Sequence, residues 1–166
     1  MNKKIKLLIV GHGRHGKDTM AEILNKHFKF EFMSSSMAAS KIFLFDALKE
    51  KYGYKTFKEC YEDRSNKRDE WYELITKYNS EDRNRLAKKI LEECDCYVGM
   101  RNPDELLQAK ETKLFDLIVW VDASERLPLE PASSMGITKD MADVIIDNNS
   151  TLEQFVERVT NLRKLS

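Results

Sequence analysis

Runs of apolar residues predict five buried strands along the chain. The first run, residues 5–10, is almost continuously apolar and ends at Gly11, which is the pattern of a strand covered on both faces of a parallel sheet. Shorter apolar or alternating runs predict four more strands, at residues 30–33, 97–100, 117–121 and 144–146. Each of the last two runs is followed by an aspartate, Asp122 and Asp147.

Apolar residues at helical spacing fill the intervals between these runs. Helices are expected directly after residue 16, over about 38–52, around 71–78, after an N-cap at Ser80, after Asn102 and Pro103, and after a capping box at 150–153. Strands interleaved with helices imply right-handed crossovers between parallel strands. The predicted fold class is therefore α/β, a three-layer α/β/α domain with a five-stranded parallel sheet.

Length and composition favour one domain. The chain has 166 residues, 42% of them hydrophobic, with 6 Gly, 3 Pro and no linker-like tract, so residues 1–166 are expected to form a single domain. The 28 basic residues balance the 28 acidic residues. This neutral charge disfavours polymeric nucleic acid as a partner but leaves it open, and the oligomeric state stays undetermined.

Targeting and cysteine signals are weak. The N-terminal segment MNKKIKLLIV has too short an apolar run for a signal peptide or a spanning helix, so we expect a cytoplasmic protein without a membrane partner. The three cysteines, Cys60, Cys94 and Cys96, lack the spacing of a zinc site and are expected to be reduced thiols.

The segment from Gly11 to Thr19 matches two phosphate-binding patterns. Gly11, Gly13 and Gly16 form G-x-G-x-x-G, the fingerprint of a dinucleotide-binding loop, and Glu31 lies about twenty residues on, where an acid for the ribose is expected. The same segment also reads G-x-x-x-x-G-K, the pattern of a P-loop. A glycine-rich turn with a purely structural role is the third interpretation.

Lys17 favours the P-loop. In a P-loop, backbone N–H groups surround the β-phosphate while a lysine directly after the last glycine neutralises the β and γ oxygens. A dinucleotide-binding loop has no use for that lysine, and 166 residues leave no room for the second domain that such enzymes carry. The residues expected to hold the nucleotide are Gly11, Gly13, Arg14, His15, Gly16, Lys17, Asp18 and Thr19.

Asp18 occupies the position at which a P-loop usually carries Ser or Thr, whose hydroxyl binds Mg²⁺. A carboxylate is also a hard oxygen ligand for Mg²⁺, so Asp18 is the predicted metal ligand. Thr19, in the same first turn of the helix, is expected to hydrogen-bond the α-phosphate.

The loop ending Gly16-Lys17-Asp18-Thr19 resembles that of the phage-type deoxynucleoside monophosphate kinases, in the P-loop nucleoside monophosphate kinase superfamily. The segments 100–105 (MRNPDE) and 142–152 (ADVIIDNNSTL) are similar to the family's strand-end arginine turn and to its closing strand and last helix. The resemblance implies a P-loop kinase fold and transfer of the γ-phosphoryl group of ATP to a deoxynucleoside monophosphate, with Mg²⁺ as cofactor. For a viral protein the location would be the host cytoplasm.

The resemblance also implies two segments that extend beyond the sheet and its covering helices. They are an acceptor-binding helical insertion at about 37–80 and a short lid at about 123–138. The sequence departs from the family at two places. Gly99 stands two residues before Arg101, where the family often carries an Asp. The expected lid is short and has Arg126 as its only arginine.

Phosphoryl transfer needs positive groups on both sides of the transferred group. Arg101 directly follows a predicted strand, so Lys17, Arg101 and Arg126 are the expected catalytic cations. The candidates for binding the acceptor are Arg101 again, three further cations and one aromatic base-stacking wall, namely Lys41, Arg64, Arg68 and Trp71, with Tyr72 as the alternative wall. The helical spacing of Trp71 also agrees with plain core packing.

Two other functions stay open. One is a P-loop kinase with a hydroxyl acceptor, such as a hydroxymethylated pyrimidine in phage DNA or the ribose of a coenzyme precursor. That reaction requires a carboxylate base, for which Asp46 and Asp63 are the candidates. The other is a module that binds a nucleotide without turning it over, which the Asp18 and Gly99 departures favour.

Overall fold

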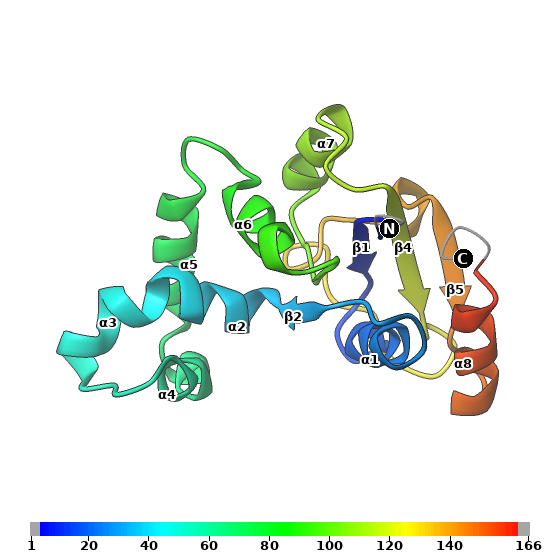
Figure 1. Cartoon of the computed structure of the whole chain (residues 1–166), viewed down its shortest axis with the longest axis horizontal. Helices are drawn as coiled ribbons and strands as arrows, with labels where there is room; N and C mark the ends of the chain where they lie inside the picture. Colours follow the sequence, from blue (N-terminus) through cyan, green and yellow to red (C-terminus); the bar gives the residue numbers. More distant parts are fainter. Residues whose placement is uncertain (1–3, 163–166) are drawn as a thin grey trace.

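Five parallel strands form the central sheet (Figure 1). The computed structural model describes residues 4–162 and orders the strands β2 (Phe32–Ser34), β3 (Cys96–Val98), β1 (Leu7–Val10), β4 (Leu117–Asp122) and β5 (Val144–Asp147). Leu8 in β1 pairs with Tyr97 on one side and Ile118 on the other. The five-stranded parallel sheet is confirmed, and its most continuously apolar strand is the central one.

Alternate residues of the strands feed two separate cores, which makes the three layers. Leu7 and Ile9 pack with α1 (Lys17–Phe28) and α8 (Leu152–Thr160) on one face. Leu8 and Val10 pack on the other face with α2 (Ser35–Ala39), α6 (Arg85–Glu93) and α7 (Pro103–Glu111). Burial on both faces explains the nearly unbroken apolar run of β1.

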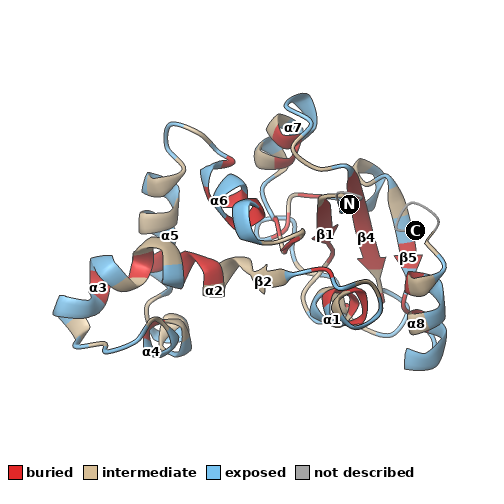
Figure 2. Ribbon diagram, viewed as in Figure 1, coloured by how far each residue is buried: buried red, intermediate tan, exposed pale blue. Residues whose placement is uncertain are grey.

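A helical region projects from the β2 edge of the sheet, at the left of Figure 1. The helix predicted over 38–52 continues through α2, the π-helical turn η1 (Ser40–Leu44) and α3 (Phe45–Tyr52), and ends at Gly53. It is followed by α4 (Phe57–Glu62), the short η2 (Arg64–Asn66) and α5 (Arg68–Tyr78). Figure 2 shows more exposed and half-buried residues in this region than in the central strands.

Helix starts differ from the sequence prediction at three places. Ser34 caps α2 by accepting the Met37 N–H, so the expected serine turn is already the start of the helix. Ser80 is not an N-cap, because α6 begins only at Arg85. The last helix is capped by Thr151, one residue later than the predicted capping box.

Helix α4 was not predicted, although its signal is present in the sequence. Thr56 accepts the Glu59 N–H, and the Glu59 carboxylate accepts the Thr56 N–H in return, which is a capping box. The short 3-10 turn η3 (Lys139–Met141) leads into β5. Among residues 4–162, no helix is both long enough and apolar enough to cross a bilayer.

Replacement of Phe155 tests the core between the sheet and α8. Phe155 is fully buried against β1, β4 and α1, so Phe155→Ala should lower the free energy of unfolding by about 3–5 kcal/mol. Leu152, in the same helix but 64% exposed, is the matched control, and Leu152→Ala should change stability by less than about 0.5 kcal/mol. Denaturant titration measures both, and equal losses would contradict the described packing.

Candidate active site

The glycine loop lies between β1 and α1, at the carboxyl end of the sheet, and touches two other strand ends. A Cβ at Gly11, where φ is +154°, would lie 2.6 Å from the Val121 carbonyl oxygen. A Cβ at Gly16, where φ is +114°, would lie 2.5 Å from Asn148 Nδ2. Glycine is therefore required at both ends of the loop, which presses against β4 and the turn after β5.

His15 fixes the loop to the scaffold. Its side chain is fully buried, Nδ1 accepts the Ala123 N–H at 3.0 Å, and Nε2 therefore donates to the Pro128 carbonyl, also at 3.0 Å. Asn148 Nδ2 donates to the His15 carbonyl at 2.9 Å. The sequence placed His15 among the nucleotide-binding residues, whereas its side chain contacts the chain after β4 and helps to shape the loop.

Lys17 lies folded over the loop that it follows. Its Nζ donates to the carbonyls of Gly11 at 2.9 Å and His12 at 3.0 Å. Burial first, and then the charge of Arg101, lower the pKa of this ammonium, while the carboxylates of Glu130 and Asp18 oppose the shift. The ammonium is thus held at the mouth of the loop, near the charged groups of Arg101 and Glu130, which follow β3 and β4 in the chain.

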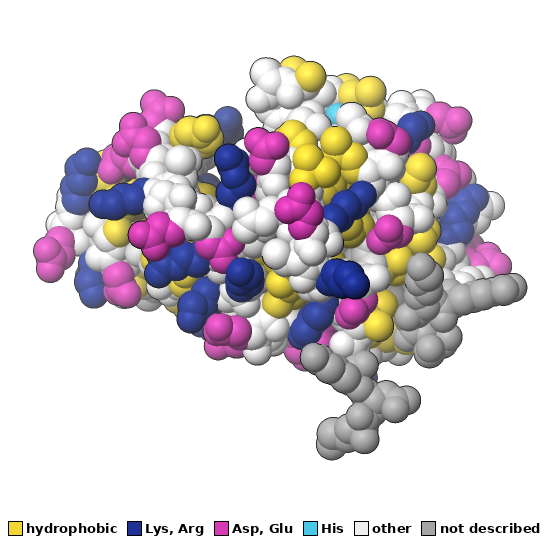
Figure 3. Space-filling model, turned by 90° about the horizontal axis from the view of Figure 1, so that it is seen from above, with side chains coloured by type: hydrophobic (Ala, Val, Ile, Leu, Met, Phe, Trp, Pro, Cys, Tyr) yellow, Lys and Arg dark blue, Asp and Glu magenta, His cyan; other side chains and the backbone are white. Residues whose placement is uncertain are grey.

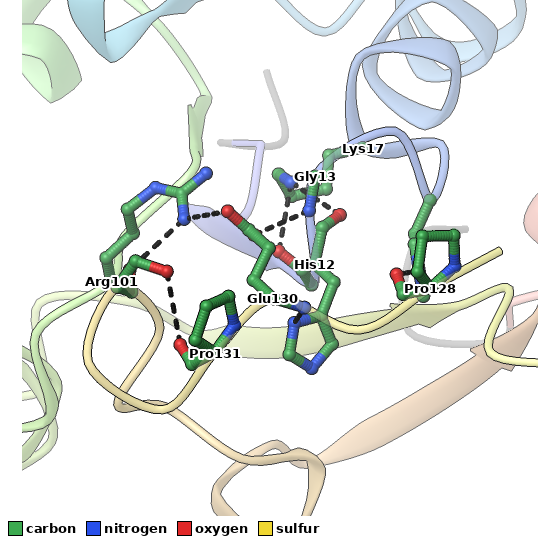
Figure 4. A network of polar contacts seen from close by, with 10 residues as sticks. His12, Gly13, Lys17, Arg101, Pro128, Glu130 and Pro131 are labelled. Carbon is green, nitrogen blue, oxygen red and sulfur yellow. Dashed lines mark hydrogen bonds and ion pairs between the residues drawn. The ribbon is translucent and has the colours of Figure 1, made fainter.

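Glu130 and Arg101 meet at the loop (Figure 4). Glu130 Oε1 accepts the Gly13 N–H at 2.6 Å, and Glu130 Oε2 accepts from Arg101 Nη1 at 2.6 Å. Arg101 Nη1 also donates to the Ser134 carbonyl at 3.2 Å. Burial alone would raise the pKa of Glu130, but the hydrogen bonds from Arg101 and Gly13 outweigh it and hold that pKa below its usual value.

A cavity of about 630 Å³ adjoins Arg101 on the side of the helical region. It is lined by Ser36 after β2, Tyr72 and Thr76 of α5, and Arg83 before α6. Arg101 and Glu105 close it from the α7 side, and Gly99 also lines it, in place of the Asp that the resemblance implies. Burial raises the pKa of the Glu105 carboxyl, against the opposing charge of Arg83.

Four of the predicted acceptor-binding residues lie elsewhere. Lys41 is 4.0 Å from Glu93, beside a different and smaller pocket. Arg64 stacks on the Tyr61 ring at 3.9 Å and, with Arg68 and Trp71, lines a separate depression. Trp71 is only 5% exposed and packs in the core, so the base-stacking interpretation is wrong for this side chain. Its neighbour Tyr72 is 74% exposed and lines the cavity.

Of the remaining predicted residues, Arg126 makes a structural hydrogen bond, whereas Arg14 and Asp18 are exposed and Thr19 is half-buried. Arg126 Nε donates to the Asn148 carbonyl at 2.7 Å, so Arg126 braces the segment after β4 in this structure. Arg14, with φ of +68°, and Asp18 are exposed, and Thr19 is half-buried. Within residues 4–162, no three His, Cys, Asp or Glu side chains form a metal cluster. Asp18 alone still suits Mg²⁺, which commonly takes one or two carboxylates together with substrate phosphates and water.

Sequence reasoning assigned no role to Glu130, Arg83 or Glu105, and it named Tyr72 only as the alternative to Trp71 for the base-stacking wall. Glu130 and Arg83 lie outside the recognised motifs, and Glu105 ends the segment MRNPDE, in which only the arginine was given a functional role. Glu130 is 117 residues away from the amide that it contacts. The structure separates the two aromatic candidates, since Tyr72 is exposed and its neighbour Trp71 on α5 is buried, as neighbouring positions on a helix point in different directions.

Comparisons with known proteins identify the fold. No family model and no curated protein sequence matches the chain. The structure resembles that of a shikimate kinase from Bacteroides thetaiotaomicron, with a TM-score of 0.52, 11% identity and 98% of each chain covered. It also resembles a protein from Thermus thermophilus, with a TM-score of 0.50, 15% identity, and 96% of this chain and 95% of that chain covered.

These likenesses show that the fold is that of the P-loop kinases, as the sequence predicts. At 11% and 15% identity they establish the fold alone. The narrower resemblance to phage-type deoxynucleoside monophosphate kinases stays a prediction.

Replacement of His15 tests the anchoring of the loop. His15→Leu leaves the Ala123 N–H and the Pro128 carbonyl without their partner, so we expect it to lower the free energy of unfolding by about 2–3 kcal/mol. His27 is exposed on α1, and His27→Leu should be nearly neutral. Denaturant titration compares the two variants. A loss for His15→Leu no larger than for His27→Leu would show that the imidazole does not hold the loop.

Proposed function

We propose that the protein is a kinase that transfers the γ-phosphoryl group of ATP, with Mg²⁺, to a deoxynucleoside monophosphate. The observation that carries the proposal is the convergence of three positive or donating groups: the Gly13 N–H and Arg101 both hold one carboxylate, and Lys17 lies beside it. Such groups are what a polyphosphate requires. They act by positioning and by stabilising charge on the transferred group.

The donor half of the site consists of the loop and the first turn of α1. In the proposal the loop amides and Lys17 hold the β- and γ-phosphates, and Thr19 hydrogen-bonds the α-phosphate. Asp18 would hold Mg²⁺ together with phosphate oxygens, and the metal would supply charge neutralisation to the polyphosphate. The exposure of the Asp18 carboxylate, adjacent to Lys17 in the first turn of α1, supports this assignment.

The acceptor half is the cavity beside Arg101. A volume of about 630 Å³ lies within the range of small-molecule sites. Two guanidinium groups, of Arg83 and Arg101, suit an anionic acceptor, because arginine binds phosphate through two parallel hydrogen bonds. The exposed ring of Tyr72 offers a surface for a base. An acceptor phosphate is already anionic, so the reaction needs positioning rather than a general base.

A kinase with a hydroxyl acceptor is the second candidate, and Glu105 is the observation that favours it. The two predicted bases are engaged elsewhere, since Asp46 pairs with Lys49 and Asp63 with Lys67. Glu105 lines the cavity, and burial raises its pKa, as a general base for a hydroxyl requires.

On the face in Figure 3, basic and acidic side chains are interspersed, so that face offers no continuous basic track for DNA.

An acceptor screen separates these candidates. Coupled detection of ADP is expected to show turnover with deoxynucleoside monophosphates and none with free nucleosides or with DNA that carries hydroxymethylated pyrimidines. Turnover with the last two acceptors alone would favour the hydroxyl reaction. Nucleotide binding without turnover on any acceptor would favour a binding module.

Lys17→Met tests the donor site. Loss of the ammonium should lower kcat by at least about a hundredfold, because one preorganised charge at the transferred group contributes roughly that much or more. Lys26, at the exposed end of the same helix, gives the control Lys26→Met, which should retain wild-type kcat. Steady-state ADP release measures both variants. Unchanged turnover in Lys17→Met would refute the proposed donor site.

Arg83→Ala tests the acceptor cavity. Loss of one charged hydrogen-bonding partner should raise the acceptor KM by about tenfold to a hundredfold and leave the KM for ATP nearly unchanged. Lys110, exposed on α7 outside the cavity lining, gives the control Lys110→Ala. Initial rates with each substrate varied in turn provide the two KM values. A change confined to the KM for ATP would show that Arg83 acts on ATP binding and not on the acceptor, which would contradict the proposed acceptor cavity.

A further inference from the structure

Glu130 places a carboxylate among the groups assigned to the nucleotide phosphates. Its two oxygens are held at 2.6 Å each, one by the Gly13 N–H and the other by Arg101 Nη1 (Figure 4). The positive charges of Arg101 and Lys17 both lower the pKa of Glu130. A carboxylate and a phosphate need the same donors, and one N–H cannot make a full hydrogen bond to both at once.

The chain around Glu130 is built to present this side chain. The Glu130 N–H donates to His12 Nδ1 at 3.0 Å, and the Pro128 carbonyl accepts from His15. Beyond Glu130, the Gly136 N–H donates to the Arg101 carbonyl at 3.1 Å. The segment after β4 is therefore tied to the loop and to Arg101 on both sides of Glu130, so its carboxylate reaches the loop from a braced backbone.

We propose that Glu130 is an internal competitor of the nucleotide: its carboxylate occupies the position of a nucleotide phosphate, and nucleotide binding must displace it. The inference rests on the proposed donor site. Displacement has a second consequence, because Arg101 also lines the acceptor cavity. Once Glu130 leaves, the Arg101 guanidinium is released to the transferred phosphoryl group, so filling of the donor site prepares the acceptor side.

Affinity for Mg²⁺-ADP, measured by titration calorimetry on the full chain, tests the proposal with three variants. Glu130→Gln removes the competing charge and should bind ADP about tenfold to a hundredfold more tightly than wild type. Glu130→Asp keeps the charge, but its side chain is one methylene shorter and cannot reach both partners, so it should also bind more tightly. Glu125→Gln is the control, since Glu125 is exposed and only its backbone N–H is bonded, to Asn149.

The outcomes separate the explanations. Unchanged or weaker ADP binding by Glu130→Gln would overturn the proposal, and weaker binding would show that Glu130 holds Arg101 in place for the nucleotide. Tighter binding by Glu130→Gln together with wild-type binding by Glu130→Asp would also overturn it, because long-range charge alone would then explain the gain. Absence of ADP binding in wild type and in all variants would refute the proposed function itself.

Hydrogen exchange of the wild-type protein gives a test that needs no variant. Saturation with Mg²⁺-ADP should speed amide exchange at Glu130 and Gly136, whose N–H groups bond to His12 and to Arg101 in this structure. Slower exchange at both amides would mean that the nucleotide closes the segment over an undisplaced Glu130, and would contradict the inference.

Discussion

Positive charge gathered at the carboxyl end of the sheet requires an anion, and much of the site is arranged around that requirement. Lys17 is partly buried at the loop, Arg101 follows β3, and the Gly13 N–H points to the same carboxylate as Arg101. Like charges held together in a partly buried site raise the free energy of the folded chain unless an anion lies between them. In this structure Glu130 supplies the anion, and in the proposed reaction a nucleotide supplies it.

The precision of this arrangement depends on the packing beneath it. Gly11 lets the loop approach β4, and Gly16 lets it approach Asn148. His15 then joins the loop to the chain after β4 through a single neutral tautomer. The two cores of the sheet position the three strand ends from which these contacts arise. The positions of the charged groups in the site therefore depend on the close contacts that the two glycines allow and on the hydrogen bonds of the buried His15.

The features that could be predicted from the sequence are those that short local patterns encode. The five parallel strands, the loop that ends in Lys17, and Arg101 at a strand end all follow from short stretches of chain. Glu130 and Arg83 could not be found in this way, since their roles depend on contacts between distant segments.

The assignments in the helical insertion were limited for the same reason. Arg64 and Arg68 were assigned to the acceptor by their place in the insertion, but Arg64 in η2 and Arg68 at the start of α5 line a separate depression. On the same helix, the apolar spacing of Trp71 did contain its true role in the core, and the exposed neighbour Tyr72 faces the cavity. The local sequence pattern thus predicted which face of α5 is buried, but it did not predict which cavity or depression each exposed side chain lines.

A crystal structure of the full chain with Mg²⁺ and a non-hydrolysable ATP analogue tests the central claim most directly. The account predicts that a phosphate oxygen of the analogue accepts the Gly13 N–H, that Lys17 has turned from the loop carbonyls to the phosphates, and that Glu130 has left both Gly13 and Arg101. An analogue bound elsewhere, with the Glu130 carboxylate still on Gly13 and Arg101, would contradict it.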